Sequence, residues 1–321
     1  MTEKKIIAVV GATGAQGGGL VRAIVADRAG PFAARALTRN ADSGRARELT
    51  SQGVEVIEAD LDEETSLRKA FDGAYGAYVV TNFWAQRTPE QERARTRAQM
   101  ELDQAAAAAR AAKDAELRHV VWSTLDDTRP HFARLGIDVP DALGSYKVPH
   151  FDAKGEANAF FTALGVPTTF LQTTLYYEGF LQGQGPHRSD NGELVLTLPM
   201  ADNPLALIAG EDIGKTALGV FRRGGQFIGK TVSIAGTIAT GEELAAKFTS
   251  ALGEQVVYRR LTTEQMRASG PVEFANSFQF YSDASGYFTG VRDLEFVREL
   301  NPELQTLDSW LTEHKNEIPL D

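Results

Sequence analysis

The chain has 321 residues, of which 43% are hydrophobic and 24% charged, and it contains no cysteine. This balance is typical of a globular protein with a medium domain and a smaller one, and the lack of cysteine excludes disulfides, thiolate nucleophiles and sulfur-ligated metals. A net charge of −10 disfavours direct binding to nucleic acid, and no segment has the roughly 18 apolar residues of a membrane span. We therefore expect a cytoplasmic protein.

The first half of the chain alternates short apolar segments with longer helical ones. The strand segments are almost continuously apolar, as is typical of parallel strands covered on both faces. This order predicts a Rossmann-type doubly wound parallel sheet. The predicted strands are 5–12, 34–39, 54–60, 77–82, 118–124 and 168–174, and the predicted helices are 15–28, 43–52, 64–72, 89–113 and 152–164.

After residue 174 the alternation becomes less regular. Further helices are predicted at 210–223, 240–252 and 306–315, and further strands within 187–200 and at 230–236 and 254–260. We divide the chain into a Rossmann domain, residues 1–172, and a smaller α+β domain, residues 173–321. The helix at 210–223 is a candidate to return to the first domain.

A glycine-rich loop follows the first predicted strand. Gly11, Gly14 and Gly17 have the spacing GxxGxxG, and the next segment, GLVRAIVAD, has helical periodicity. Glycines allow a sharp turn and a close backbone approach to a pyrophosphate, whose charge the amides of the following helix stabilise. Because a strand precedes the loop and a helix follows it, the loop predicts a dinucleotide site.

The second predicted strand ends in Thr38, Arg39 and Asn40, about twenty residues after the glycines. An acidic residue at this place bonds the ribose 2′-hydroxyl of NAD. Arg39 instead predicts NADP(H), because a guanidinium can hold a 2′-phosphate through paired charge-assisted hydrogen bonds. A solvated surface arginine is the alternative.

Polar residues also follow the third and fourth strands. Asp60 and Leu61 stand where the adenine edge usually lies in this fold, although Asp60 alone is equally compatible with an ordinary turn. Residues 81–83 are expected to line the approach to the nicotinamide.

The segments GATGAQGG, TRN, ADLD, VVTNFW and HFDAKGE together resemble the NmrA-like family, atypical members of the short-chain dehydrogenase/reductase superfamily. The resemblance covers nearly the whole chain and is closest to the branch whose members bind NADPH and act as redox sensors. Other family members are transcriptional co-regulators or NADPH-dependent reductases of quinones or dyes. The resemblance implies cofactor contacts from Gly11, Ala12, Thr13, Gly14, Ala15, Gln16, Gly17, Thr38, Arg39, Asn40, Asp60, Leu61, Thr81, Asn82, Phe83, Lys154, Thr174, Leu175, Tyr176 and Tyr177.

One family feature is absent near the start of the helix after the fourth strand. Some relatives have a cofactor-contacting lysine there, whereas Ala94 falls near that place in this chain, between Arg93 and Arg95. Whether either arginine replaces the lysine is left open, with a solvated helix face as the alternative.

The catalytic pattern of the superfamily is incomplete. Its reductases use YxxxK with an upstream serine, and this chain has His150 in the tyrosine position, with Lys154 and Ser123 as the matching lysine and serine. An imidazolium can donate a proton, but a nearby lysine lowers its protonated fraction, so His150 can equally be a packing residue. Tyr146 is a poor substitute for the missing tyrosine, because Pro149 interrupts the helix between Tyr146 and His150.

Two functions fit a complete cofactor site with a broken proton relay. We favour a redox sensor whose protein partner changes with the NADPH/NADP ratio. The alternative is a reductase of quinones, which need little general-acid help; a conventional carbonyl reductase using His150 is a third possibility. Aromatic residues of the second half can form either a substrate pocket or a core: Phe180, Phe278, Phe280, Tyr281 and Phe288. The histidines have no metal-ligand spacing, so no metal site is predicted.

Overall fold

The central sheet has seven parallel strands and is described by a computed structural model that covers residues 3–320. Across the sheet the strands are β11 (Thr231–Ser233), β6 (Thr168–Gln172), β5 (His119–Thr124), β4 (Gly76–Val79), β1 (Lys5–Val9), β2 (Phe32–Thr38) and β3 (Glu55–Glu58). Because the chain winds outward in both directions from β1 and β4, the predicted doubly wound parallel sheet is confirmed.

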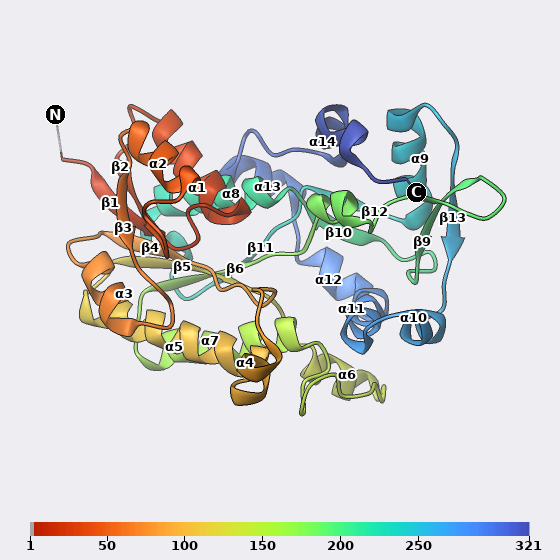
Figure 1. The fold of residues 1–321 in the computed structure, drawn as a ribbon, viewed down its shortest axis with the longest axis horizontal. Helices are drawn as coiled ribbons and strands as arrows, with labels where there is room; N and C mark the ends of the chain where they lie inside the picture. Colours follow the sequence, from red (N-terminus) through yellow and green to blue (C-terminus); the bar gives the residue numbers. More distant parts are fainter. Residues whose placement is uncertain (1–2, 321) are drawn as a thin grey trace.

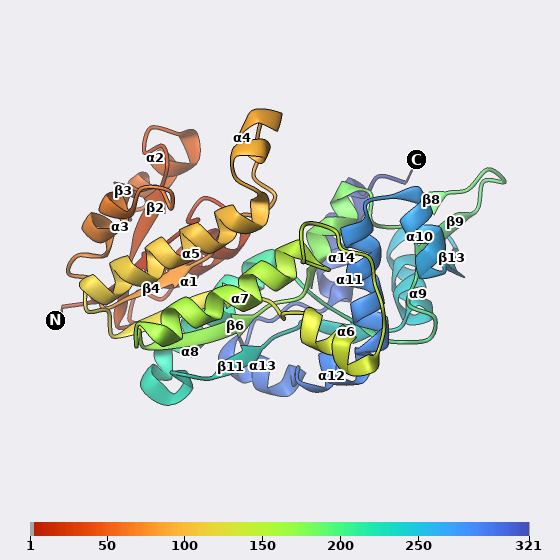
Figure 2. The same ribbon diagram turned by 90° about the horizontal axis from the view of Figure 1, so that it is seen from below.

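Helices cover both faces of this sheet. They are α1 (Ala15–Ala26), α2 (Gly44–Ser51), α3 (Glu64–Phe71), α5 (Arg97–Asp114), α7 (Pro149–Ala163), α8 (Gly210–Arg222) and α13 (Leu294–Leu300). Figure 1 shows α1, α8 and α13 above the sheet, and Figure 2 shows α3, α5 and α7 on the opposite face. Two short helices lie outside these layers (Figure 2): α4 (Pro89–Ala94) and α6 (Arg129–Leu135).

Two three-stranded sheets and further helices form the other end of the molecule (Figure 1). One sheet contains β12 (Thr237–Ala239), β10 (Leu205–Ile208) and β7 (Leu175–Tyr176); the other contains β13 (Val256–Arg260), β9 (Leu194–Leu198) and β8 (His187–Arg188). The helices are α9 (Gly241–Leu252), α10 (Thr263–Ser269), α11 (Val272–Asp283), α12 (Ser285–Gly290) and α14 (Leu307–His314), with 3₁₀ turns η1 (Tyr177–Gln182), η2 (Gly224–Phe227) and η3 (Lys315–Glu317).

Elements from the second half complete the first sheet. α8 packs against α1, and β11 pairs in parallel with β6. β11 therefore belongs to the Rossmann sheet although it lies in the second half of the sequence. The domain boundary after residue 172 stays a prediction.

The predicted helix 89–113 is wrong in one respect, because it is two helices. Arg95 has extended backbone angles, and the Thr96 side chain accepts a hydrogen bond from the amide of Gln99 as the N-cap of α5. A threonine that caps a new helix satisfies an otherwise unpaired amide, which stabilises the break. α7 also begins at Pro149, three residues before the predicted start, since proline is well suited to the first turn.

Glycines allow α1 and α8 to touch along their backbones. A Cβ on Gly214 would lie 2.1 Å from the carbonyl oxygen of Gln16, and a Cβ on Gly19 would lie 2.3 Å from that of Glu211. No side chain fits at either point, so the two helices meet only because both positions are glycine.

Gly214→Ala is expected to lower the free energy of unfolding by about 3 kcal/mol, because the added methyl forces two backbones apart. The control is Gly286→Ala in α12, where an added Cβ has no atom within 4 Å and the helix favours alanine by up to about 1 kcal/mol. Urea unfolding of both variants tests this. Equal stabilities of Gly214→Ala and the parent protein would contradict the contact.

Candidate functional site

A cavity of about 1200 Å³ lies at the carboxyl ends of the parallel strands. Its walls include residues that directly follow β1, β2, β3, β4 and β5. Ligands of doubly wound sheets bind at this edge, and typical small-molecule pockets measure about 300–1,000 Å³. The cavity is therefore large enough for a long ligand with space beyond it.

The glycine loop forms the floor of one end of the cavity. Gly11 has φ +68°, and a Cβ on Gly17 would lie 2.5 Å from the carbonyl oxygen of Gly11. The loop thus packs so tightly that only glycine fits at residue 17. All of the predicted loop residues line the cavity except Ala12, which is turned into the core and is 1% exposed.

The predicted residues at the end of β2, residues 38–40, all line the cavity. Arg39 is exposed and forms no ion pair with any side chain of residues 3–320. Its guanidinium is therefore available to an anionic ligand.

The structure adds a second arginine that the sequence analysis missed. Ser43, Gly44 and Arg45, at the start of α2, also line the cavity, and Arg45 Nη1 donates to the carbonyl oxygen of Thr13 at 3.1 Å. Ser43 is the N-cap of α2, because its side chain accepts from the amide of Ala46. A serine cap followed by an arginine was the available signal, since helix N-termini and guanidinium groups both favour anions.

The predicted residues after β3 and β4 also line the cavity: Asp60, Leu61, Thr81, Asn82 and Phe83. The Asp60 carboxylate accepts from the amide of Asp62 at 3.0 Å, as in a turn. Neither arginine near Ala94 enters this cavity. Arg93 pairs with Glu90 at 2.9 Å, and Arg95 pairs with Asp62 at 2.8 Å.

Lys154 is held by a buried carboxylate. Its Nζ lies 3.2 Å from Glu101 Oε2, and it also donates to the hydroxyl and the carbonyl oxygen of Thr81. Glu101 is 1% exposed and Lys154 is 9% exposed. An ammonium has three protons to donate, so the protein already offers an acceptor for each of them. The predicted ribose contact of Lys154 therefore requires one of its three protons to be shared between its present acceptor and the ribose.

Ser123 belongs to a network centred on Gln16. The Ser123 hydroxyl donates to Gln16 Oε1 at 2.8 Å, and the Tyr78 hydroxyl donates to the same oxygen. Gln16 Nε2 in turn donates to the hydroxyl of Tyr176. The Gln16 amide thus connects the hydroxyls of Ser123 and Tyr78, on its oxygen side, to that of Tyr176, on its nitrogen side.

His150 lies in the cavity wall against aromatic rings. Its ring centroid is 5.7 Å from that of Phe83 and 5.1 Å from that of Trp84, and its Nδ1 has no hydrogen-bond partner among the described residues. Burial, together with the ammonium of Lys154, lowers the pKa of His150 to about 3. The imidazole is then neutral at neutral pH, which favours the alternative that His150 is a packing residue over a charged proton donor.

Tyr146 faces away from the cavity and does not replace the missing tyrosine. Its hydroxyl donates to Glu156 at 3.2 Å, and its ring lies under the Arg129 guanidinium. Asp152 instead fixes the start of α7, because its buried carboxylate accepts hydrogen bonds from the backbone amides of Lys147 and Val148. This anchor positions His150 in the first turn of the helix.

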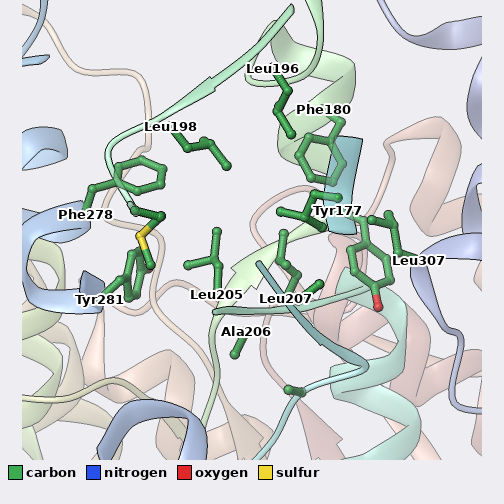
Figure 3. Packing of buried hydrophobic residues seen from close by; sticks show 14 of the residues in the cluster. Tyr177, Phe180, Leu196, Leu198, Leu205, Ala206, Leu207, Phe278, Tyr281 and Leu307 are labelled. Atoms are coloured by element: carbon green, nitrogen blue, oxygen red, sulfur yellow. The ribbon is translucent and has the colours of Figure 1, made fainter. Parts of the chain in front are cut away.

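Among residues 174–177, Tyr177 does not line the cavity. Its hydroxyl donates to Thr237 at 2.8 Å, and Figure 3 shows its ring in the core beside Leu207 and Leu307. β7 ends at Tyr176 and the 3₁₀ turn η1 begins at Tyr177, and here the chain leaves the cavity wall, so Tyr176 lines the cavity and Tyr177 does not. Thr174 and Leu175 also line it.

Aromatic side chains from the second half form the far end of the cavity. Phe274, Phe278 and Tyr281 of α11 line it together with Phe151 of α7 and Trp84. The Trp84 and Phe274 rings stack, with centroids 5.4 Å apart. All five aromatic residues considered for a pocket belong to the buried core cluster. Phe278 and Tyr281 also line the cavity, whereas the other three do not: Phe180, Phe280 and Phe288.

Residues 3–320 contain neither a candidate metal site nor a candidate membrane-spanning helix. No group of three or more histidine, aspartate or glutamate residues is placed to hold a metal ion. Within the same residues, no helix is both long and apolar enough to cross a membrane.

The geometry defines a Rossmann-type protein with a nucleotide site that continues into an aromatic pocket. The NmrA-like family model matches residues 3–311, so the chain belongs to the NmrA-like family. The resemblance in the sequence motifs is thereby confirmed.

Two curated relatives are oxidoreductases. The chain is 32% identical over 181 residues to the NmrA-like family domain-containing oxidoreductase himF of Aspergillus japonicus, a match that spans 56% of this chain and about half (49%) of the relative. It is 29% identical over 263 residues to an NAD(P)H azoreductase of Xenophilus azovorans, covering 82% of this chain and 79% of that protein.

Solved structures share the fold over almost the whole chain. NmrA, a negative transcriptional regulator solved in complex with NADP, has a TM-score of 0.73 at 22% identity, covering 97% of this chain and 95% of NmrA. An NADPH-dependent quinone oxidoreductase of Escherichia coli has a TM-score of 0.68 at 20% identity, covering 97% and 100%. The shared fold is thus common to a regulator and an enzyme.

The buried ion pair makes a prediction about stability. Glu101→Leu should lower the free energy of unfolding by about 3–5 kcal/mol, because it leaves the Lys154 ammonium buried without its carboxylate. The double variant Glu101→Leu/Lys154→Met should recover most of this loss, since no buried charge is left unpaired. Urea unfolding of the parent, the single variant and the double variant measures both effects. A double variant as unstable as the single one would rule out the ion pair as the cause.

Proposed function

We propose that this protein is an NADPH-dependent reductase of flat conjugated acceptors, with quinones as the main class. The observation that supports it is the continuity of the cavity. The same space is lined by the glycine loop at one end and by Phe274, Phe278 and Tyr281 at the other. A site for the cofactor alone has no need of an aromatic pocket beyond it, whereas a planar acceptor packs well against aromatic rings.

The cofactor fits the polar end of the cavity. The loop from Gly11 to Gly17 and the start of α1 suit the pyrophosphate, while Arg39, Arg45 and the N-terminus of α2 suit a 2′-phosphate. The relative named NAD(P)H azoreductase reduces a conjugated acceptor according to its name and spans most of this chain. When bound, the reduced nicotinamide would supply the hydride.

The class of hydride acceptor follows from the lack of a strong proton donor at the site. His150 is neutral, Tyr146 lies outside the cavity, and Lys154 is paired with Glu101. A substrate that requires a strong general acid is therefore poorly served. Quinones suit such a site, because the anion formed by hydride addition is stabilised by resonance and solvent can protonate it.

A redox sensor is the second candidate. It is favoured by the same lack of a proton relay and by the fold shared with the regulator NmrA. In that case the cofactor binds without turnover, and the NADPH/NADP ratio controls a protein partner.

Loss of NADPH absorbance with quinones, enones and simple aldehydes separates these functions. We expect turnover with quinones and none with aldehydes. Turnover of aldehydes that disappears in His150→Phe would instead assign proton transfer to the histidine. A flat trace with every acceptor, with tight NADPH binding confirmed by calorimetry in the same buffer, would overturn the reductase in favour of the sensor.

Arg39 makes a prediction about the choice of cofactor. NADPH should bind more tightly than NADH, and Arg39→Ala should weaken NADPH binding by roughly tenfold to a hundredfold with little effect on NADH, because the lost group contacts only the 2′-phosphate. Calorimetric titrations of both cofactors measure this, with Arg93→Ala as the control for an arginine outside the cavity. Equal affinities of the parent protein for NADPH and NADH would refute the role of Arg39.

A further inference from the structure

The Tyr176 hydroxyl has an unusual set of neighbours. Its oxygen accepts a hydrogen bond from Gln16 Nε2. This contact does not use the phenolic proton. Since Tyr176 is half-buried and lines the cavity, that proton is available to an acceptor atom in the cavity.

The direction of the network supports this reading. Ser123 and Tyr78 both donate to Gln16 Oε1, and this orientation of the amide directs its nitrogen toward Tyr176. Ser123 is the second-last residue of β5, the strand at whose end the superfamily's substrate-binding serine stands, and here its hydroxyl already donates to Gln16. Of the three hydroxyls around this amide, only that of Tyr176 does not donate to it.

We propose that Tyr176 is the hydrogen-bond donor to the acceptor oxygen that becomes negative on reduction, with Gln16 as its positioning residue. This inference rests on the proposed reductase function and assigns its oxyanion site. A quinone that accepts a hydride gains two electrons and one hydrogen, and the resulting hydroquinone monoanion carries its charge on oxygen. NADP⁺ is the oxidised product, and a proton from solvent completes the hydroquinone.

The phenol suits donation better than proton transfer. Burial raises the pKa of Tyr176 to about 12, and this outweighs the lowering by the hydrogen bonds from Gln16 and Thr173. A tyrosine that stays protonated is a fixed donor to a developing oxyanion, a form of stabilisation that needs no charge on the protein.

Two acceptors test the assignment, because only one of them develops a negative oxygen on reduction. 1,4-Naphthoquinone develops an oxyanion, whereas the cationic dye malachite green takes the hydride at its central carbon and becomes neutral. Tyr176→Phe should lower kcat for naphthoquinone by roughly a hundredfold, as removal of one oxyanion donor does, while its rate with malachite green stays within about threefold of the parent. Tyr146→Phe, which removes a phenol outside the cavity, should change neither rate.

Other results would overturn the assignment. Unchanged naphthoquinone reduction in Tyr176→Phe would do so. So would an equal loss with both acceptors together with weaker NADPH binding, because that pattern marks a cofactor contact.

A binding measurement keeps the inference separate from the proposed function. If the parent protein reduces neither acceptor, the reductase proposal fails, and ionised 4-nitrophenolate is then titrated into the NADP⁺ complex by calorimetry. About tenfold tighter binding to the parent than to Tyr176→Phe would support the oxyanion site on its own. Equal binding to both proteins would overturn it.

Discussion

The close packing of α1 between the glycine loop and α8 determines the geometry of the whole site. Gly17 meets the carbonyl oxygen of Gly11, and Gly214 meets that of Gln16. Helix α1 can therefore start directly beneath the cavity, with its N-terminal amides facing it and the Gln16 side chain at the meeting point of the central strands. A larger residue at either glycine would move the anion-binding end of the helix and the Gln16 amide together.

Two sets of polar groups beneath the cavity pair with one another. Lys154 forms an ion pair with Glu101, and Gln16 Oε1 accepts hydrogen bonds from Ser123 and Tyr78. Buried groups need such partners. A buried amide without a hydrogen bond destabilises the fold by about 1–3 kcal/mol, and a buried charge without its partner by about 3–5 kcal/mol. The consequence for function is that few donors remain for a ligand. The site therefore favours hydride acceptors that can be reduced without a strong general acid.

Local patterns were sufficient for the sheet, the glycine loop and the residues at the strand ends, because each depends on a short stretch of chain. Contacts made across long sequence separations were not accessible. Glu101 reads as one more polar residue in an alanine-rich helix, and only the packing of α5 against α7 places it beside Lys154. Tyr176 and Tyr177 were predicted alike, although Tyr177 begins the 3₁₀ turn η1 and lies in the core. Arg45 was missed because its significance depends on the return of α2 to the loop.

The central claim is that one cavity holds the reduced cofactor and a flat acceptor together. The most direct measurement is a stopped-flow single turnover, in which the preformed complex with NADPH is mixed with excess 1,4-naphthoquinone and the NADPH absorbance is followed. The account predicts complete decay at a rate that saturates with quinone concentration, because the acceptor binds before the hydride moves. Decay no faster than that of free NADPH with the quinone would contradict it.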